Sequence, residues 1–352
     1  MSVLILSPSG DAHGDAVHAA LRDREVETVR LSGADFPVRD TLSIWLGAGR
    51  HDLRVETERT GVVDLSRVDA VWRRRGEYPR IDAEQIHPED RRFAHKEAEA
   101  AADGLRDVSA LLGRAAWINP RRAALQAQNK PYQLAQAMRA GLAVPPTLIS
   151  NAPVEVRAFC QAAANPVIYK PLTAAVWEDE GAVLAYFVTE LDAETLADDD
   201  LLRATPGIYQ EKIDKAFELR VTVMDRFVHA VKIDSQALEA AQTDWRRHID
   251  ELAVKPFALP QEVEARVLDF MAAMGLRFGA LDLIVTPEGE HIFLEVNEMG
   301  QFLWIEQSAP SERLLAHFCA YLCCTERPYR GGLGRFETAR FADYEPKPAV
   351  RA

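Results

Sequence analysis

The segment from Ala280 to Met299 constrains this chain more than any other part of its sequence. It contains two runs in which apolar and polar residues alternate, separated by the turn residues Pro287-Glu288-Gly289-Glu290, and this pattern predicts a β-hairpin. If those residues form the loop, Asp282 lies opposite Glu295. Strand interiors disfavour aspartate, so its position within the apolar run LDLIV requires an explanation.

A metal site would explain that aspartate. Side chains alternate between the two faces of a strand, so Glu295 and Asn297 share one face and Asp282 joins them across the hairpin. Mg²⁺ takes oxygen ligands and is commonly held by one or two carboxylates together with substrate phosphates. The hairpin is therefore a candidate Mg-nucleotide site, with a solvated polar strand face as the alternative interpretation.

Cationic residues elsewhere in the chain suit the phosphate side of such a site. Lys130 begins a predicted helix and Lys170 ends the predicted strand VIYK, so each could present an ammonium group to a cleft. Arg220 lies in the apolar strand ELRVTVM and could bind a phosphate or acyl phosphate with its guanidinium fork. The alternative for Arg220 is a salt bridge to Glu211 or Glu218.

The predicted elements divide the chain into four parts. Residues 1–120 open with a strand, a loop and a helix, which is typical of a small α/β domain with a parallel sheet, and a long helix is predicted from His95 to Leu112. Asn119-Pro120 marks the end of this domain. The other predicted parts are a central lobe at 121–207, a strand-rich lobe with the hairpin at 208–325, and a loosely packed tail at 326–352.

Composition limits the compartment and the partners. Lys plus Arg is 41 and Asp plus Glu is 54, which gives a net charge of −13 and disfavours general nucleic-acid binding. The four cysteines show no paired framework and the first residues lack the basic region of a signal peptide, so we expect a cytoplasmic protein. No apolar run approaches the roughly 18 residues of a membrane span, so none is expected.

The order of the candidate residues resembles that of the ATP-grasp superfamily. The matching residues are, in chain order, Lys130, YKPL with Lys170, YQEKI with Glu211, ELR with Arg220, Asp282 and LEVN. The resemblance covers about residues 120 to 325 and implies an ATP-grasp fold of α+β lobes preceded by a pre-ATP-grasp α/β domain. One departure is the loop after Lys170, where only Gly181 stands in place of the usual glycine-rich flap.

The resemblance also implies a role for each residue. Lys130 and Lys170 would contact the nucleotide phosphates, and Glu218 would reach the ribose. Arg220 and Lys170 would act in catalysis. The residues implied for the adenine are Glu211, Lys212 and Ile213, and those implied for two Mg²⁺ ions are Asp282, Glu295 and Asn297.

Within the superfamily, the sequence resembles the graspetide synthetases, which are microviridin-type ligases. The resembling pieces are VWRRRGEYP, the stretch 119–151, and KIDSQ followed by DWRR. In that family, ATP phosphorylates a Glu or Asp side chain of a ribosomally made precursor peptide. A Ser, Thr or Lys side chain of the same peptide then closes an ester or amide macrocycle. The resemblance implies a homodimer.

Substrate contacts are expected beside the cleft. The candidates are Arg73, Arg74, Arg75, Lys232, Asp234, Asp244, Arg246, Trp304 and Glu306. For the three arginines, the alternative is a solvated cluster paired with Glu77 and Asp69, and the segment from Trp177 to Ala185 is the candidate lid. Two other functions stay open: a ligase that joins a free amino acid or small acid to an amine, and an inactive ATP-binding regulator. The regulator is disfavoured because the candidate metal ligands are all present.

Overall fold

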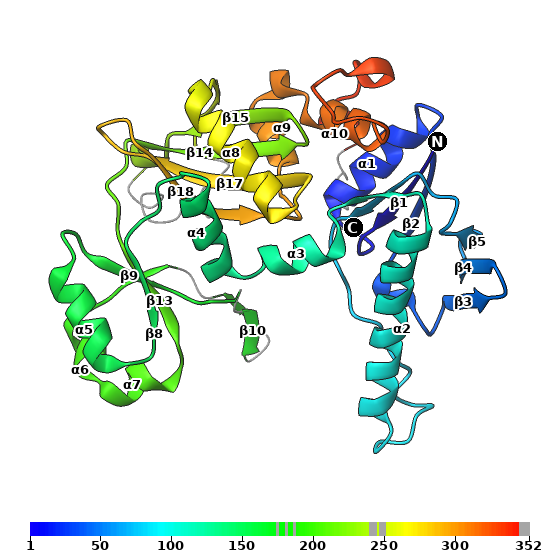
Figure 1. The fold of residues 1–352 in the computed structure, drawn as a ribbon, viewed down its shortest axis with the longest axis horizontal. Helices are drawn as coiled ribbons and strands as arrows, with labels where there is room; N and C mark the ends of the chain where they lie inside the picture. The colour runs from blue at the N-terminus through cyan, green and yellow to red at the C-terminus, as the bar shows by residue number, and fades with distance from the viewer. Residues whose placement is uncertain (174–175, 180–181, 186–187, 239–244, 246–250, 345–352) are drawn as a thin grey trace, which may run out of the picture.

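The chain folds into an N-terminal domain, a central lobe and a C-terminal lobe (Figure 1). The computed structural model describes residues 1–352 except 174–175, 180–181, 186–187, 239–244, 246–250 and 345–352. The N-terminal domain and the C-terminal lobe lie side by side, and the central lobe projects away from them (Figure 1). Among the helices of the described residues, none combines the length and the apolar character that crossing a membrane requires.

A parallel sheet forms the centre of the N-terminal domain, as predicted. Its strands β1 (Ser2–Leu6), β2 (Glu27–Leu31), β6 (Ala70–Arg73) and β7 (Ala116–Ile118) lie in the order β2-β1-β6-β7. The helices of this domain are α1 (Ala12–Arg22), which begins at its N-cap Asp11, the long α2 (Arg91–Leu112), and the 3-10 turn η1 (Gly33–Asp35). A separate antiparallel sheet contains β3 (Thr41–Gly47), β4 (Arg50–Thr57) and β5 (Gly61–Asp64).

The central lobe follows α3 (Arg121–Ala127) and α4 (Lys130–Arg139). Its sheet has the order β12-β9-β13-β8, with β8 (Thr147–Ser150), β9 (Val167–Lys170), β12 (Thr189–Glu190) and β13 (Gly207–Glu211). Its helices are α5 (Pro153–Ala162), α6 (Ala193–Ala197) and α7 (Asp199–Ala204). Strands β10 (Val176–Asp179) and β11 (Ala182–Ala185) pair as a hairpin within the predicted lid segment.

A five-stranded antiparallel sheet organises the C-terminal lobe. Its order is β16-β15-β14-β17-β18, from β14 (Phe217–Met224), β15 (Phe227–Ile233), β16 (Val254–Phe257), β17 (Phe278–Val285) and β18 (His291–Asn297). One face of β14 packs with α8 (Gln261–Met274) through Leu219, Val221 and Val223. The remaining elements are α9 (Leu303–Ser308), α10 (Leu314–Leu322), η2 (Ser235–Ala237), η5 (Pro310–Glu312), η6 (Gly334–Phe336) and η7 (Phe341–Asp343).

One hydrophobic core joins the N-terminal domain to the C-terminal lobe. It contains Ile5 and Trp72 from the parallel sheet together with Phe278 and Phe318 from the C-terminal lobe. The rings of Trp72 and Phe318 pack edge to face with their centroids 4.6 Å apart. The central lobe has a separate core of its own. The N-terminal domain and the C-terminal lobe therefore form one packed unit.

The described part of the C-terminal segment differs from the loosely packed tail predicted for 326–352. Tyr329, Phe336 and Phe341 are buried in the shared core. The carboxylate of Glu306, which is 3% exposed, accepts hydrogen bonds from the amides of Leu315 (2.8 Å) and Phe341 (2.7 Å). Glycines and scattered charge suggested a loosely packed tail. The segment is instead held in place because its aromatic side chains are buried in the shared core.

Candidate active site

The predicted carboxylate hairpin is formed by β17 and β18. Asp282 pairs with Glu295 in the register, as expected, and Ala280 pairs with Asn297, so the three oxygen-bearing side chains lie on one face. The loop itself differs from the prediction, because Val285 pairs with His291 and the turn therefore includes Thr286. A register shift between Asp282 and Leu283 restores the predicted pairing at the carboxylates.

Arg220 lies next to this pair on the neighbouring strand. β14 pairs with β17 so that Arg220 is opposite Asp282, and its Nη1 lies 2.7 Å from the Asp282 Oδ1. Its Nη2 donates to the carbonyl of Gln301 at 2.9 Å. The alternative of a salt bridge from Arg220 to Glu211 or Glu218 is thus replaced by an ion pair with Asp282. Both partners are buried, so the ion pair fixes the orientation of the carboxylate.

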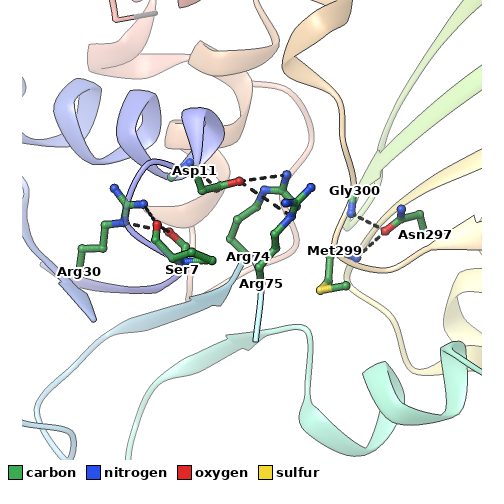
Figure 2. Close-up of polar contacts among 10 residues, drawn as sticks. Ser7, Asp11, Arg30, Arg74, Arg75, Asn297, Met299 and Gly300 are labelled. Carbon is green, nitrogen blue, oxygen red and sulfur yellow. Dashed lines mark hydrogen bonds and ion pairs between the residues drawn. The ribbon is translucent and has the colours of Figure 1, made fainter. Parts of the chain in front are cut away.

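Asn297 makes a local contact in this structure. Its Oδ1 accepts hydrogen bonds from the amides of Met299 (3.1 Å) and Gly300 (3.0 Å), as Figure 2 shows. An amide oxygen has two lone pairs, so both are engaged here. Within the part of the chain that the structure describes, no group of three His, Cys, Asp or Glu side chains is arranged for a metal ion. The oxygen donor set of the hairpin therefore centres on Asp282 and Glu295.

Two buried amide side chains hold the hairpin in place. Asn119 donates to the carbonyls of Phe278 and Glu298, each at 2.8 Å, and accepts from the amides of Arg277 (2.8 Å) and Phe278 (2.9 Å). Gln133 of α4 accepts from the Val296 amide at 2.7 Å and donates to its carbonyl at 3.1 Å. Our sequence reasoning used Asn119 only as a domain boundary and gave Gln133 no role.

The two predicted lysines lie in the central lobe and its approach. The Lys130 ammonium donates to the carbonyl of Pro171 at 3.0 Å, just after β9. The Lys170 ammonium donates to the Gln210 side chain at 2.7 Å, and Gln210 in turn donates to Thr147 at 2.9 Å. Both ammonium groups therefore lie at the end of β9 where Lys170 was predicted, although the helix carrying Lys130 is distant in sequence.

The strand β13 leads to the residues expected to meet the adenine. The amides of Glu211 and Lys212 donate to the carbonyls of Pro146 (3.0 Å) and Pro166 (2.8 Å), so both are engaged within the lobe. The Glu211 carboxylate accepts from the Asn165 side chain at 2.8 Å. The adenine contact of Glu211, Lys212 and Ile213 stays a prediction.

Glu218 lies on the same sheet face as Arg220, two residues away along β14. Burial raises the pKa of the Glu218 carboxyl, and the ammonium of Lys215, 2.5 Å away, acts in the opposite direction. A buried carboxyl paired in this way is held in one position. Its contact with a ribose stays a prediction.

The arginines after β6 occupy different environments. Arg74 is 2% exposed, and its Nη2 lies 3.4 Å from the Asp11 Oδ1, while the Nε of Arg75 lies 4.0 Å from the same oxygen (Figure 2). Arg73 and Arg75 both line a cavity beside Arg106 of α2. Glu77 accepts a hydrogen bond from Ser32, and Asp69 pairs with Arg114. The solvated alternative is therefore wrong for Arg74, which is buried against Asp11.

Other predicted substrate residues separate in the structure. Lys232 pairs with Leu219 in the register, and its ammonium lies 4.4 Å from the centre of the Phe217 ring, so it is on the sheet face opposite to Arg220. Glu306 anchors the C-terminal segment through the Leu315 and Phe341 amides. The ring of Trp304 packs on Trp245, with centroids 5.2 Å apart. Asp234 precedes η2, and Asp244 and Arg246 lie outside the described residues.

The N-terminal domain and the whole fold match known proteins. Residues 2–124 match the family described as MvdD pre-ATP grasp domain. A Chryseobacterium gregarium RiPP-associated ATP-grasp ligase in complex with ADP and a leader and core peptide is 27% identical, with a TM-score of 0.84 over 93% of this chain and 98% of that chain. The chain has the ATP-grasp fold.

Two macrocyclases from Microcystis aeruginosa MRC support the same assignment. MdnC, bound with the precursor peptide MdnA, is 28% identical with a TM-score of 0.79 over 92% of this chain and 99% of that chain. MdnB is 28% identical with a TM-score of 0.74 and the same coverage. No curated protein matches the chain. The chain therefore resembles the graspetide synthetases along nearly its whole length.

Proposed function

We propose that this ATP-grasp ligase macrocyclises a ribosomally made precursor peptide, joining Glu or Asp side chains to hydroxyls or amines as ω-esters or ω-amides. The observation that carries the proposal is the full-length similarity to ligases whose structures contain leader, core or precursor peptides. The chemistry of the candidate site also supports it, because the side chains of Asp282, Glu295 and Arg220 share one sheet face.

The proposed chemistry activates a carboxylate that would not otherwise condense with an alcohol or amine in water. A carboxylate oxygen of the peptide attacks the γ-phosphorus of ATP, the bond to the β,γ-bridging oxygen breaks, and ADP leaves. A Ser or Thr hydroxyl or a Lys amine of the same peptide then attacks the acyl carbon. Inorganic phosphate leaves with the bonding electrons and the nucleophile loses its proton, so the peptide loses one water for each ring.

The residues fit distinct parts of this reaction. Lys130 and Lys170 bring positive charge to the nucleotide phosphates, and Arg220 brings it to the metal face, where electrostatic positioning is the main source of rate in phosphoryl transfer. The carboxylates of Asp282 and Glu295 fit Mg²⁺, which when bound neutralises charge on the transferred group. A second ion would need the amide oxygen of Asn297 to turn from its own loop.

The main alternative is a ligase that joins a free amino acid or small acid to an amine. It uses the same nucleotide and metal residues, so those residues do not separate the two functions. The similarity to peptide-bound ligases favours the macrocyclase. An inactive regulator is disfavoured because Asp282 and Glu295 are both present and directly paired.

We further propose a cytoplasmic homodimer that does not bind nucleic acid. The net charge of −13 supports the absence of nucleic-acid binding, because an acidic surface repels phosphate backbones. The four cysteines are free, which suits a reducing compartment. Sedimentation of the purified chain tests the dimer.

A mass measurement tests the function. The enzyme is incubated with ATP, Mg²⁺ and a synthetic precursor peptide encoded by a short reading frame beside its gene. We expect the peptide to lose one water for each ring and ADP to form in the same molar amount. With the Glu295→Gln variant, we expect the mass of the peptide to stay unchanged. ADP release with free amino acids, and none with the peptide, would support the small-acid ligase instead.

A further inference from the structure

The loop after β1 and the arginines after β6 meet at the carboxyl ends of these two neighbouring strands of the parallel sheet. β1 pairs with β2 on one side and with β6 on the other, so the chain connections leave in opposite directions from this position. In open parallel sheets, ligands bind in the crevice outside the carboxyl ends of strands at such a switch point. The side chains at this switch point are those of Ser7, Asp11, Arg74 and Arg75 (Figure 2).

Charge at the switch point is unbalanced. Asp11 uses Oδ2 to cap α1, accepting from the Gly14 amide at 2.8 Å, which leaves Oδ1 to face both Arg74 and Arg75. Among the described residues, the ion pairs of these two guanidinium groups are with this one carboxylate. One positive charge is therefore uncompensated, and the positive end of the α1 dipole lies at the same place.

Arg74 is built into this position. Its side chain is 3% exposed, and its Nε is buried with no hydrogen-bond partner among the described residues. Its ion pair with Asp11, at 3.4 Å, is longer than a charge-assisted hydrogen bond of about 2.8 Å. Burying an arginine without satisfying its donors is costly, so the arrangement suits a ligand that supplies acceptor oxygens.

The switch point faces the metal hairpin. His13 of α1 lies between them: its ring packs edge to face on Phe302, with centroids 5.3 Å apart, just after the loop that Arg220 holds. Burial and then the charges of Arg74, Arg75 and Arg220 lower the pKa of His13 to about 3, so its imidazole is neutral and adds no charge. His13 is therefore within electrostatic reach of all three guanidinium groups.

We propose that Arg74 and Arg75 bind the acidic side chain of the precursor peptide that is to be phosphorylated. The inference rests on the proposed function and deepens it. The ammonium groups of Lys130 and Lys170 lie at the end of β9, where the proposed function places the nucleotide phosphates. A carboxylate on the N-terminal-domain side of the metal hairpin would therefore meet the γ-phosphate from the face opposite to the nucleotide. Two guanidinium forks match the two oxygens of a carboxylate.

A double-mutant cycle tests this assignment. The variants are Arg75→Met, whose side chain is 48% exposed and so tolerates replacement, and Arg74→Lys, which keeps the charge but loses the fork. The matched control is Arg114→Met, an exposed arginine paired with Asp69 beside the opposite end of the same sheet. Calorimetry with Mg·ADP present measures the affinity for the synthetic precursor peptide and for its version with glutamine in place of the reacting Glu.

We expect Arg75→Met to weaken binding of the acidic peptide about 10-fold, as for the loss of one hydrogen bond to a charged group. The wild type should bind the glutamine peptide more weakly than the acidic peptide by the same factor. Arg75→Met should bind the two peptides with equal affinity. Arg74→Lys should raise the KM for the peptide and leave the KM for ATP unchanged, and Arg114→Met should change neither.

Two results would overturn the inference while the wild type still dehydrates the peptide. One is that the effects of Arg75→Met and of the glutamine peptide simply add. The other is a rise in the KM for ATP with unchanged peptide affinity, which would assign the arginines to the nucleotide phosphates. Failure of the proposed function would appear differently, as a wild type that dehydrates no peptide, and the inference would fail with it.

Discussion

Replacing Asn119 by alanine should loosen the metal hairpin. The side chain is 3% exposed and makes four hydrogen bonds, to Arg277, Phe278 and Glu298, across 158 to 179 residues of sequence. A buried hydrogen bond contributes about 1 kcal/mol net, so Asn119→Ala should cost about 4 kcal/mol. Water has little access to the buried amide site, so it cannot replace the lost partners.

Hydrogen exchange measures this loss where it occurs. At 1.36 kcal/mol for each factor of ten, about 4 kcal/mol should speed exchange of the β17 and β18 amides by about 1,000-fold when they open locally. Peptides from the central lobe, which has a separate core, should keep their exchange rates. Turnover should fall as well, because Asp282 and Glu295 lose their fixed position.

Two further variants control this measurement. Asn119→Asp keeps the shape and the acceptors but points a carboxylate at the carbonyls of Phe278 and Glu298, so it should be at least as damaging at neutral pH. Asn151→Ala removes an exposed side chain with one long hydrogen bond of 3.4 Å, so it should cost less than about 0.5 kcal/mol. Hairpin exchange in Asn119→Ala within about threefold of the wild type would refute the reasoning, since the clamp would then contribute under about 1 kcal/mol.

Glu295→Gln should lower turnover by at least about 100-fold with an unchanged unfolding midpoint, whereas Asp282→Ala should also lose about 3 kcal/mol because Arg220 stays buried without its partner; equal turnover of either variant and the wild type would contradict the metal site. Acid should destabilise the fold, because His13 and His317 have pKa values of about 3 and about 4 in the folded chain against 6.5 unfolded, so only the unfolded chain gains these protons below pH 6.5. Each histidine should lower the free energy of unfolding by about 2 kcal/mol between pH 8 and pH 5. In urea unfolding, His317→Phe should abolish the contribution of His317 to this pH dependence; an unchanged pH slope in the variant would contradict the prediction. Glu306→Ala should release the C-terminal segment, seen as proteolysis within 326–344 that the wild type resists.

The pattern of the hairpin was readable from the sequence because it is local. Alternation and turn residues predicted the pairing of Asp282 with Glu295, and the parallel sheet followed from short apolar strands and the helix between them. The turn length was wrong, since Thr286 joins the loop and a bulge restores the register. A single sequence contains no signal for where an extra residue is absorbed.

Contacts between distant residues were the part that the sequence did not reveal. Lys232 looked like a cleft residue, but its face depends on the pairing of β15 with β14, which places it opposite Leu219. Solvation was the alternative for Arg74 because arginine is usually exposed, but its side chain is buried against Asp11, 63 residues earlier in the chain. The available clue was positional: Asp11 and Arg74 each follow a strand of one parallel sheet, so they had to share its carboxyl edge.

The two proposed binding events fall on different structural units. The hairpin, Arg220 and the arginine pair belong to the unit joined by the shared core and by Asn119, whereas Lys170 belongs to the central lobe with its separate core. The geometry between the acidic side chain and the metal carboxylates is therefore fixed within one packed body, and the nucleotide must bridge that body and the lobe. It follows that Arg75→Met should act on the peptide alone, while loosening the hairpin at Asn119 should affect peptide and nucleotide together.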